Sequence, residues 1–369
     1  INIIRFIYSQ NHFTNIMATA ITVTTNIGCR VQCKFCPQDD IMTSYAEKEK
    51  TPKIEFGNPA MMTYQTFVSI LEKIPKDISI IFSGFTEPYL NPECGKMIEY
   101  AFERGHKIQV FSTLVGMTLQ DVDILKKADE KLTKFIIHLP DVEKYAKIAL
   151  TSEFKQVLEK IISLPIKNTR LMSMGTVPEK IENIIGVKIN ASEMVSWAGH
   201  IDYVDQNETV DGPILCGIDD GGDNKGIPAV VVPSGDVVLC VKDWSMEYIL
   251  GNLLRCTFKD LYQSKRYKEV IQRMASDNDD VLCRNCEHAI SVKKIQESEQ
   301  RLKDLQIDRT DKISQKLDEI WQIYLYRPID VDGLIYFYDK IKNKKMDLTE
   351  VVRHVKNSSE YLSQRFKIN

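Results

Sequence analysis

The segment Thr25–Pro37 reads TNIGCRVQCKFCP and carries three cysteines, Cys29, Cys33 and Cys36, separated by three and then two residues. It follows a short apolar run, Ile21–Thr25, that predicts a strand. The cysteines therefore lie in a loop that can turn three thiolates toward one metal centre. An iron–sulfur cube needs four thiolates for closure, so three leave one iron without a protein ligand. Such an open position is typical of catalytic metal sites, whereas structural zinc takes four protein ligands, and no fourth Cys or His lies nearby.

Outward from this loop, short β-like runs alternate with helical patterns from Ala18 to about Asp211. Strands that alternate with helices predict crossover connections and a parallel sheet. About six strands fit, fewer than the eight of a closed barrel, so we expect an α/β fold with a partial (β/α)6 barrel over residues 18–211. The clearest strand candidates are Ile21–Thr25, Ile78–Ser83, Ile108–Ser112, Phe135–His138 and Arg170–Ser173. The helices are expected at Tyr64–Lys73, Glu93–Arg104, Leu119–Lys127 and Glu153–Ser163.

Residues 212–290 have a different composition and are expected to form a small α+β cysteine-rich auxiliary domain. Ala229–Val232 and Val237–Val241, joined by the turn sequence PSGD, predict a β-hairpin. Helical patterning follows at Phe258–Met274. An acidic loop before the hairpin lacks the full ligand pattern of an EF-hand, which favours a solvated turn over a calcium site. Its acids are Asp219, Asp220 and Asp223.

The two ends of the chain differ from the core. Residues 291–369 predict a separate charged helical module, in which Ile307–Leu325 is amphipathic and ends before Arg327-Pro328. Residues 1–17 are interpreted as an N-terminal extension. Because the sequence begins with Ile1 and Met17 stands directly before the first strand, either translation begins at Met17 or the sequence is a fragment.

Composition narrows the function. The chain has 369 residues, 43% hydrophobic and 27% charged, with a net charge of -3, which gives no electrostatic reason to expect nucleic acid or an anionic membrane as partner. No apolar run approaches the ~18 residues of a membrane span, and no secretion signal is recognisable. The sequence has nine cysteines, an odd number that cannot all pair in disulfides, and no export signal accompanies them. We therefore expect a cytoplasmic protein whose clustered cysteines bind metal.

The cysteine spacing, with aromatic Phe35 before Cys36, resembles the signature of radical SAM enzymes. The resemblance implies that a [4Fe–4S] cluster on Cys29, Cys33 and Cys36 binds S-adenosylmethionine at its open iron. One electron then cleaves the cofactor to a 5′-deoxyadenosyl radical, which abstracts hydrogen from the substrate. Phe35 is expected beside the adenine. A low-potential electron donor such as flavodoxin or ferredoxin is implied as partner.

Further stretches extend this resemblance. Gly84, Phe85, Thr86 and Glu87 end the second strand candidate, where the family has a glycine-rich stretch that contacts the cofactor's amino group; here only one glycine is present. A strand-to-helix turn is the alternative. Ser112 and Thr113 end the third candidate, where the family places a polar residue on the ribose. Trp197 stands where the family usually carries Arg, and His138, at the end of the fourth candidate, favours a structural role over a proton relay.

Four further cysteines resemble the auxiliary-cluster extension called SPASM, in its shortened, twitch-type form with one cluster. Its ligands would be Cys216, Cys240, Cys283 and Cys286. Four thiolates close a cluster, so its expected role is electron transfer, with a structural zinc or iron–sulfur site as the alternative. Two other cysteines, Cys94 and Cys256, are expected to be buried small apolar residues.

The implied reaction is oxidation of an alcohol on a sugar or amino-sugar-like compound, with the auxiliary cluster as electron acceptor. Asp243 is a candidate base, or equally an aspartate that stabilises the hairpin. In the tail, Ile323–Leu334 and Ser358–Tyr361 resemble a small helical module found beside glycosyltransferases, which favours a sugar. Two alternatives stay open: modification of a ribosomal peptide by the same chemistry, and a non-enzymatic zinc-binding interaction protein with a Cys₄ site.

Overall fold

The computed structural model describes residues 17–164, 166–206, 208–218, 226–325 and 329–358. These residues fall into two compact units, one that ends at Ala289 and one that begins at Ile290. Parts of the sequence singled out above lie outside the described residues. They are the extension up to residue 16, the acidic residues Asp219, Asp220 and Asp223, the Arg327-Pro328 pair, and Ser359–Tyr361.

The first unit is built on an eight-stranded sheet in the order β11-β10-β9-β1-β4-β5-β6-β7. Five strands run parallel in chain order through its main part, which confirms the predicted α/β class with a parallel sheet. All four residues of the central strand β1 are buried, as is usual for parallel sheets covered on both faces. The five strands are β1 (Ala20–Val23), β4 (Ser79–Phe82), β5 (Ile108–Ser112), β6 (Leu132–His138) and β7 (Thr169–Met172).

The sixth parallel strand comes from an unexpected part of the chain. Within the described residues, the region 18–211 supplies five strands to this sheet, and the other neighbour of β1 is β9 (Val230–Val231). A hairpin joins β9 to β10 (Asp236–Val238), as predicted, and β11 (Ile249–Asn252) pairs with β10 at the edge. The cysteine-rich segment therefore continues the main sheet.

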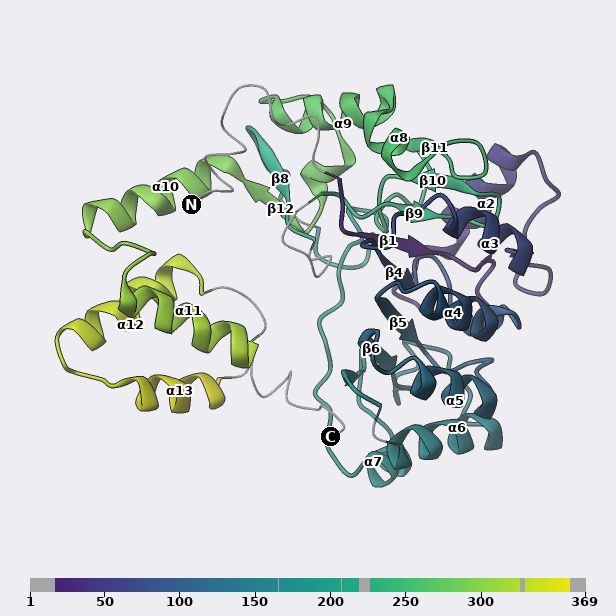
Figure 1. The fold of residues 1–369 in the computed structure, drawn as a ribbon, viewed down its shortest axis with the longest axis horizontal. Helices are drawn as coiled ribbons and strands as arrows, with labels where there is room; N and C mark the ends of the chain where they lie inside the picture. The colour runs from purple at the N-terminus through teal and green to yellow at the C-terminus, as the bar shows by residue number, and fades with distance from the viewer. Residues whose placement is uncertain (1–16, 165, 207, 219–225, 326–328, 359–369) are drawn as a thin grey trace. The chain divides into compact units, whose positions relative to one another are not determined.

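Helices connect the parallel strands and pack against one another in chain order. Figure 1 shows α3 to α6 in a row along one side of the sheet. Threonine side chains cap three of them, because their hydroxyls accept a hydrogen bond from a free amide of the first turn. These helices are α3 (Tyr64–Leu71), α4 (Cys94–Glu103), α5 (Leu119–Lys127), α6 (Ser152–Ser163) and α7 (Glu179–Ile185).

Two helices of the first unit were not predicted, α7 and the helix after the first cysteine loop. The latter is α2 (Gln38–Glu49), in a segment for which no helix was expected. Its apolar face is narrow, with Ile41, Met42 and Tyr45 buried, and it packs into one core cluster with Val230 and Val238 of the hairpin. The helical pattern of this segment is weak, so the helix is stabilised by packing against residues that are distant in sequence.

The remaining elements of the first unit are short. Ser264 divides the helix predicted at Phe258–Met274, because its side chain caps a new helix by accepting from the Tyr267 amide at 3.1 Å. The helices are α8 (Phe258–Gln263) and α9 (Lys265–Ala275), with 3₁₀ turns η1 (Pro88–Leu90) and η2 (Leu282–Asn285). The small strand pairs are β2 (Asn26–Ile27) with β3 (Ala60–Met61), and β8 (Ile214–Cys216) with β12 (Ala289–Ser291).

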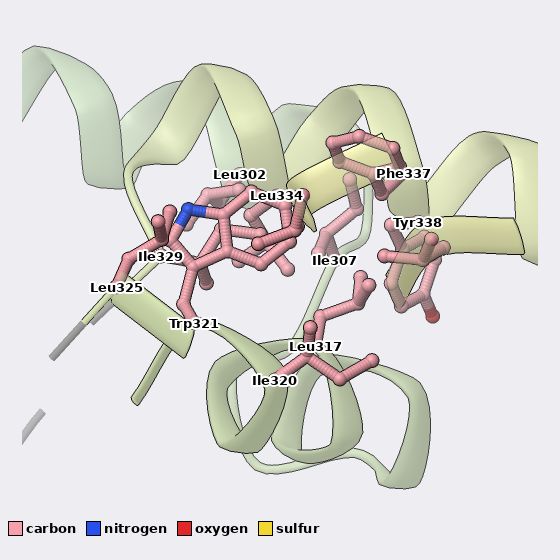
Figure 2. Packing of buried hydrophobic residues seen from close by; sticks show 12 residues of the cluster. Leu302, Ile307, Leu317, Ile320, Trp321, Leu325, Ile329, Leu334, Phe337 and Tyr338 are labelled. Atoms are coloured by element: carbon pink, nitrogen blue, oxygen red, sulfur yellow. The ribbon is translucent and has the colours of Figure 1, made fainter. Parts of the chain in front are cut away.

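The second unit is helical, as expected. Its core gathers apolar side chains from all four helices, and Figure 2 shows Trp321 and Leu334 within this cluster. Ile307 belongs to the same core, although the predicted helix begins only at Lys312. The helices are α10 (Val292–Asp304), α11 (Lys312–Leu325), α12 (Val331–Lys342) and α13 (Leu348–Lys356). Within the described part of the chain, no helix has the length and apolar character to span a membrane.

Candidate cluster and cofactor sites

The first cysteine loop turns tightly. Gly28 has φ +102° and Gln32 has φ +48°, and the Cys36 amide donates to the Cys33 carbonyl at 3.1 Å. Interaction with the Cys36 thiol, followed by burial, raises the pKa of Cys33, and burial raises the pKa of Cys29 to about 11. The loop thus gathers thiols in a place that disfavours the thiolate form, and a nearby positive charge such as that of a metal would favour it.

Gln38, the first residue of α2, holds this loop in place, and sequence reasoning missed it. Its side-chain carbonyl accepts from the Cys29 amide at 3.2 Å, and its amide donates to the Phe85 carbonyl at 2.7 Å. Gln38 is buried. One side chain therefore ties the first cysteine to the segment after β4. A glutamine at this position carries no signal of its own, because its role depends on both partners.

The segment after β4 approaches β1 closely. Gly84 has φ +89°, and a Cβ at this position would lie 2.1 Å from the Thr24 hydroxyl oxygen. That hydroxyl accepts from the Phe85 amide at 3.2 Å, and the Asn26 side chain donates to the Thr86 hydroxyl at 2.7 Å. Only glycine adopts this backbone conformation readily and fits the space beside Thr24, which explains the glycine at position 84.

Glu87 and Ser112 come together at the carboxyl ends of β4 and β5. The Glu87 carboxylate is 3% exposed and accepts from the Ser112 hydroxyl at 2.8 Å, the Tyr89 amide at 3.1 Å, and the hydroxyl and amide of Thr113. Burial raises the pKa of Glu87, and these hydrogen bonds oppose that shift. Ser112 also accepts from the Leu114 amide at 2.8 Å. The two side chains are thus engaged with the protein, and their contacts with a cofactor stay predictions.

Phe35 and His138 stack at the carboxyl end of β6. Their ring centroids are 5.1 Å apart with an interplanar angle of 15°. His138 Nε2 is buried and has no hydrogen-bond partner among the described residues, and burial lowers the pKa of His138 to about 4. A buried polar atom without a partner is unfavourable. A neutral imidazole nitrogen next to the first cysteine loop is therefore free to bind a polar group of a ligand.

The four predicted auxiliary cysteines line one pocket. They come from separate elements: Cys216 ends β8, Cys240 follows β10, and Cys283 and Cys286 belong to η2 and its C-terminal cap. Most of the other lining side chains are apolar. The complete lining is Leu215, Cys216, Ile218, Ile227, Cys240, Lys242, Leu282, Cys283, Cys286, His288 and Ala289. Neither Cys94 nor Cys256 is among them. Cys94 is fully buried, as expected, whereas Cys256 is only half-buried, so the expectation of burial is wrong for Cys256.

Backbone amides point at two of these sulfurs. The Lys242 amide donates to Cys240 Sγ and the His288 amide to Cys286 Sγ, each at 3.4 Å. Burial raises the pKa of Cys240 and Cys283, and that of Cys286 to about 11. Amide hydrogen bonds to sulfur are a feature of iron–sulfur ligation, where they tune the cluster.

No three His, Cys, Asp or Glu side chains in the described ranges are arranged to hold a single metal ion. This finding concerns single ions. In an iron–sulfur cube each thiolate binds a different iron, so the sulfurs need not converge on one point.

Asp243 is buried in the turn before β11, at 1% exposure. Its two carboxylate oxygens accept from the Glu247 amide at 2.8 Å and the Tyr248 amide at 2.9 Å. Burial raises the pKa of Asp243 to about 6. These contacts support the stabilising alternative for Asp243, and its role as a base stays a prediction.

Comparison with known proteins gives one domain match. Residues 226–287 match SPASM, an iron–sulfur cluster-binding domain. The range includes Cys240, Cys283 and Cys286, and Cys216 precedes it. No curated protein matches the chain.

Several solved structures are similar. BtrN in complex with AdoMet and 2-DOIA is 14% identical, with 75% of this chain and 95% of BtrN covered and a TM-score of 0.50. AnSMEcpe with bound AdoMet is 13% identical over 73% of this chain and 86% of its own, with a TM-score of 0.43. SuiB of Streptococcus suis, bound to precursor peptide SuiA, is 11% identical over 73% and 70%, with a TM-score of 0.22. The likeness to BtrN shows a shared mixed α/β fold, and with the SPASM match it confirms the resemblance to radical SAM enzymes with a SPASM-type extension.

Proposed function

We propose that this protein is a radical SAM enzyme that holds two [4Fe–4S] clusters and oxidises an alcohol of a small, sugar-like substrate. The observation that carries the proposal is the gathering of Cys29, Cys33 and Cys36 in one loop after β1, tied by Gln38 to the segment after β4. In open α/β sheets, ligands bind outside the carboxyl ends of the strands, which is where this loop lies.

The residues of this edge fit the cofactor. The three cysteines of the first loop would hold a cluster with one iron left open for S-adenosylmethionine, and the bound group would supply the radical chemistry that abstracts hydrogen from substrate. Phe35 would lie against the adenine, with His138 Nε2 free to bind a polar group nearby. Gly84, which has no side chain, would let the backbone after β4 approach the cofactor's amino group, and Glu87 with Ser112 holds the strand ends in register.

The second pocket fits a closed cluster. Cys216, Cys240, Cys283 and Cys286 supply four thiolates, and two backbone amides donate to the sulfurs. A closed cluster has no iron for substrate, so electron transfer is its role in this proposal. The SPASM match over most of this segment supports it.

The proposal keeps the predicted architecture and partners. Residues 18–211 would form the partial barrel, 212–290 the auxiliary-cluster domain and 291–369 the helical module. Electrons would come from a low-potential carrier such as flavodoxin or ferredoxin. The likeness to BtrN, solved with AdoMet and 2-DOIA, supports a small molecule as substrate.

Anaerobic reconstitution of the full chain with iron and sulfide tests the proposal. We expect about eight iron atoms and eight sulfides per chain, since each cube contains four of each. Release of 5′-deoxyadenosine from S-adenosylmethionine under reducing conditions should follow, and it should increase with sugar or amino-sugar alcohols. Four irons or fewer, or bound zinc in their place, would contradict the two-cluster proposal. Stimulation by peptides in place of sugars would support the ribosomal-peptide alternative.

A further inference from the structure

A buried lysine lies beside the auxiliary cysteines. Lys242 is among the residues that line the pocket. Its side chain is 5% exposed, and its ammonium pairs with the carboxylate of Glu287, which is 12% exposed. The Lys242 backbone amide also donates to Cys240 Sγ. Burial of an ion pair carries a large desolvation penalty, so a pair in this position needs an explanation beyond stability.

The indole of Trp197 also contacts the ammonium of Lys242. Lys242 Nζ lies 4.0 Å from the ring centroid, a cation–π contact. Trp197 Nε1 donates to the Phe35 carbonyl at 2.6 Å, so the same indole contacts the first cysteine loop. Trp197 and Ala198 have φ of +54° and +59°, and the Ala198 amide donates to Glu287 at 3.2 Å. This strained, hydrogen-bonded backbone fixes the indole over the lysine.

The two charges of the pair act on the pocket with opposite signs. Lys242 is among the lining residues, and Glu287 follows Cys286 directly, so that the lysine lowers and the glutamate raises the pKa of the Cys286 thiol. Reduction adds one negative charge to a cluster, so a nearby cation favours the reduced form and a nearby anion disfavours it. In an apolar surrounding these effects are large, because little water screens them.

We propose that Lys242 is a positioning residue that raises the reduction potential of the auxiliary cluster, with Glu287 and Trp197 holding its ammonium at the pocket. This inference rests on the proposed function, since it requires a cluster on the four cysteines. The consequence is that the auxiliary cluster accepts an electron more readily than the same four-cysteine cluster would with a neutral residue at position 242. Lys242 and Glu287 then act on the potential in opposite directions.

A redox titration of the reconstituted holoprotein with dithionite, followed by electron paramagnetic resonance, tests this inference. Lys242→Met should lower the potential of the auxiliary cluster by at least a tenfold change in the one-electron equilibrium, or about 59 mV. Glu287→Gln should raise it, and the double variant should lie between the single variants. Lys242→Arg keeps the charge and should stay close to wild type.

Two controls keep the test decisive. Lys53→Met removes an exposed lysine that pairs with Glu55 at 3.8 Å, and it should leave the potential unchanged. A variant in which Cys29, Cys33 and Cys36 are all Ala assigns the auxiliary signal. If Lys242→Met and Glu287→Gln retain iron and shift the potential in the same direction, or not at all, the inference is overturned while the two-cluster proposal stands. If the wild-type chain shows no auxiliary signal, both are overturned.

Discussion

The two cysteine sites are assembled in opposite ways. The first takes Cys29, Cys33 and Cys36 from one loop, and polar contacts to α2 and the segment after β4 fix that loop. The second takes its four thiols from β8, the segment after β10, and η2 with its cap, and surrounds them with mainly apolar side chains and Lys242. A local motif thus gathers the three thiols of the proposed open site, whereas tertiary structure gathers the four thiols of the proposed closed one. The difference predicts that each site can be damaged without loss of the other.

Loss of a thiol should separate the two sites most strongly. Cys33→Ala should remove about four irons and lower deoxyadenosine release by on the order of a thousandfold, beyond the 10- to 100-fold typical of residues that only support a metal ligand. Cys283→Ala should remove a similar amount of iron but leave cleavage of S-adenosylmethionine in the absence of substrate. Iron analysis and product chromatography measure both. Equal loss of cleavage in the two variants would contradict the division of roles.

The close approach at Gly84 belongs to the first site. Gly84→Ala places a methyl group 2.1 Å from the Thr24 hydroxyl in a left-handed backbone, and should reduce the free energy of unfolding by on the order of 3 kcal/mol. Gly57→Ala is the matched control, because a Cβ there meets nothing within 4 Å, and it should change stability by less than about 0.5 kcal/mol. Urea unfolding of the apoprotein gives both values. Similar values for the two variants would refute this account.

His138 should make the first site sensitive to acid. Burial lowers its folded pKa to about 4, below the ordinary value of about 6.5 expected in the unfolded chain. Between these values the unfolded chain binds the extra proton, so stability is complete above pH ~6.5 and falls as pH decreases toward ~4. His138→Phe should remove on the order of 2 kcal/mol of this dependence in unfolding experiments at pH 7 and pH 5. An unchanged pH slope would show that the imidazole is already protonated in the fold.

An effect of similar size is expected at Gln38. Gln38→Leu removes two buried hydrogen bonds and leaves the Cys29 amide and Phe85 carbonyl unpaired, which should cost about 1–3 kcal/mol. Reconstitution of the first cluster should be slower, with the auxiliary cluster unaffected. Gln120→Leu, on the exposed surface of α5, is the control and should affect neither. Slower loading of both clusters would mean that the sites are not independent.

Sequence patterns predicted what depends on neighbours along the chain. The first cysteine loop, the five parallel strands and the hairpin at its PSGD turn were all readable, because spacing, apolar runs and turn residues are local. The helix α2 was missed because most of its residues are polar and its stability comes from packing against the hairpin. For Asp243 the sequence left two roles open, and its contacts with the Glu247 and Tyr248 amides, which support the stabilising role, depend on the folded turn.

Non-local partners set the limit of that prediction. The short apolar run at Val230 does not indicate by itself that it pairs with β1. Parallel pairing of two strands leaves no recognisable pattern in the sequence that separates them. The meeting of Lys242, Trp197 and Glu287 is equally hidden, because they come from three separate parts of the chain. Charged and aromatic residues of this kind usually indicate a solvated surface, and burial gives them another role.

The pairing of β1 with β9 also bears on how the protein is made. Thr22 lies opposite Val230, so a ribosome must synthesise most of the first unit before β1 gains this neighbour. Until then the backbone groups on one side of the central strand stay open to other chains, a known risk for aggregation during synthesis. Contacts between such distant residues also slow folding. For the proposed clusters, delivery of iron and sulfide is therefore expected to follow translation, once the late hairpin has closed the sheet beside the first cysteine loop.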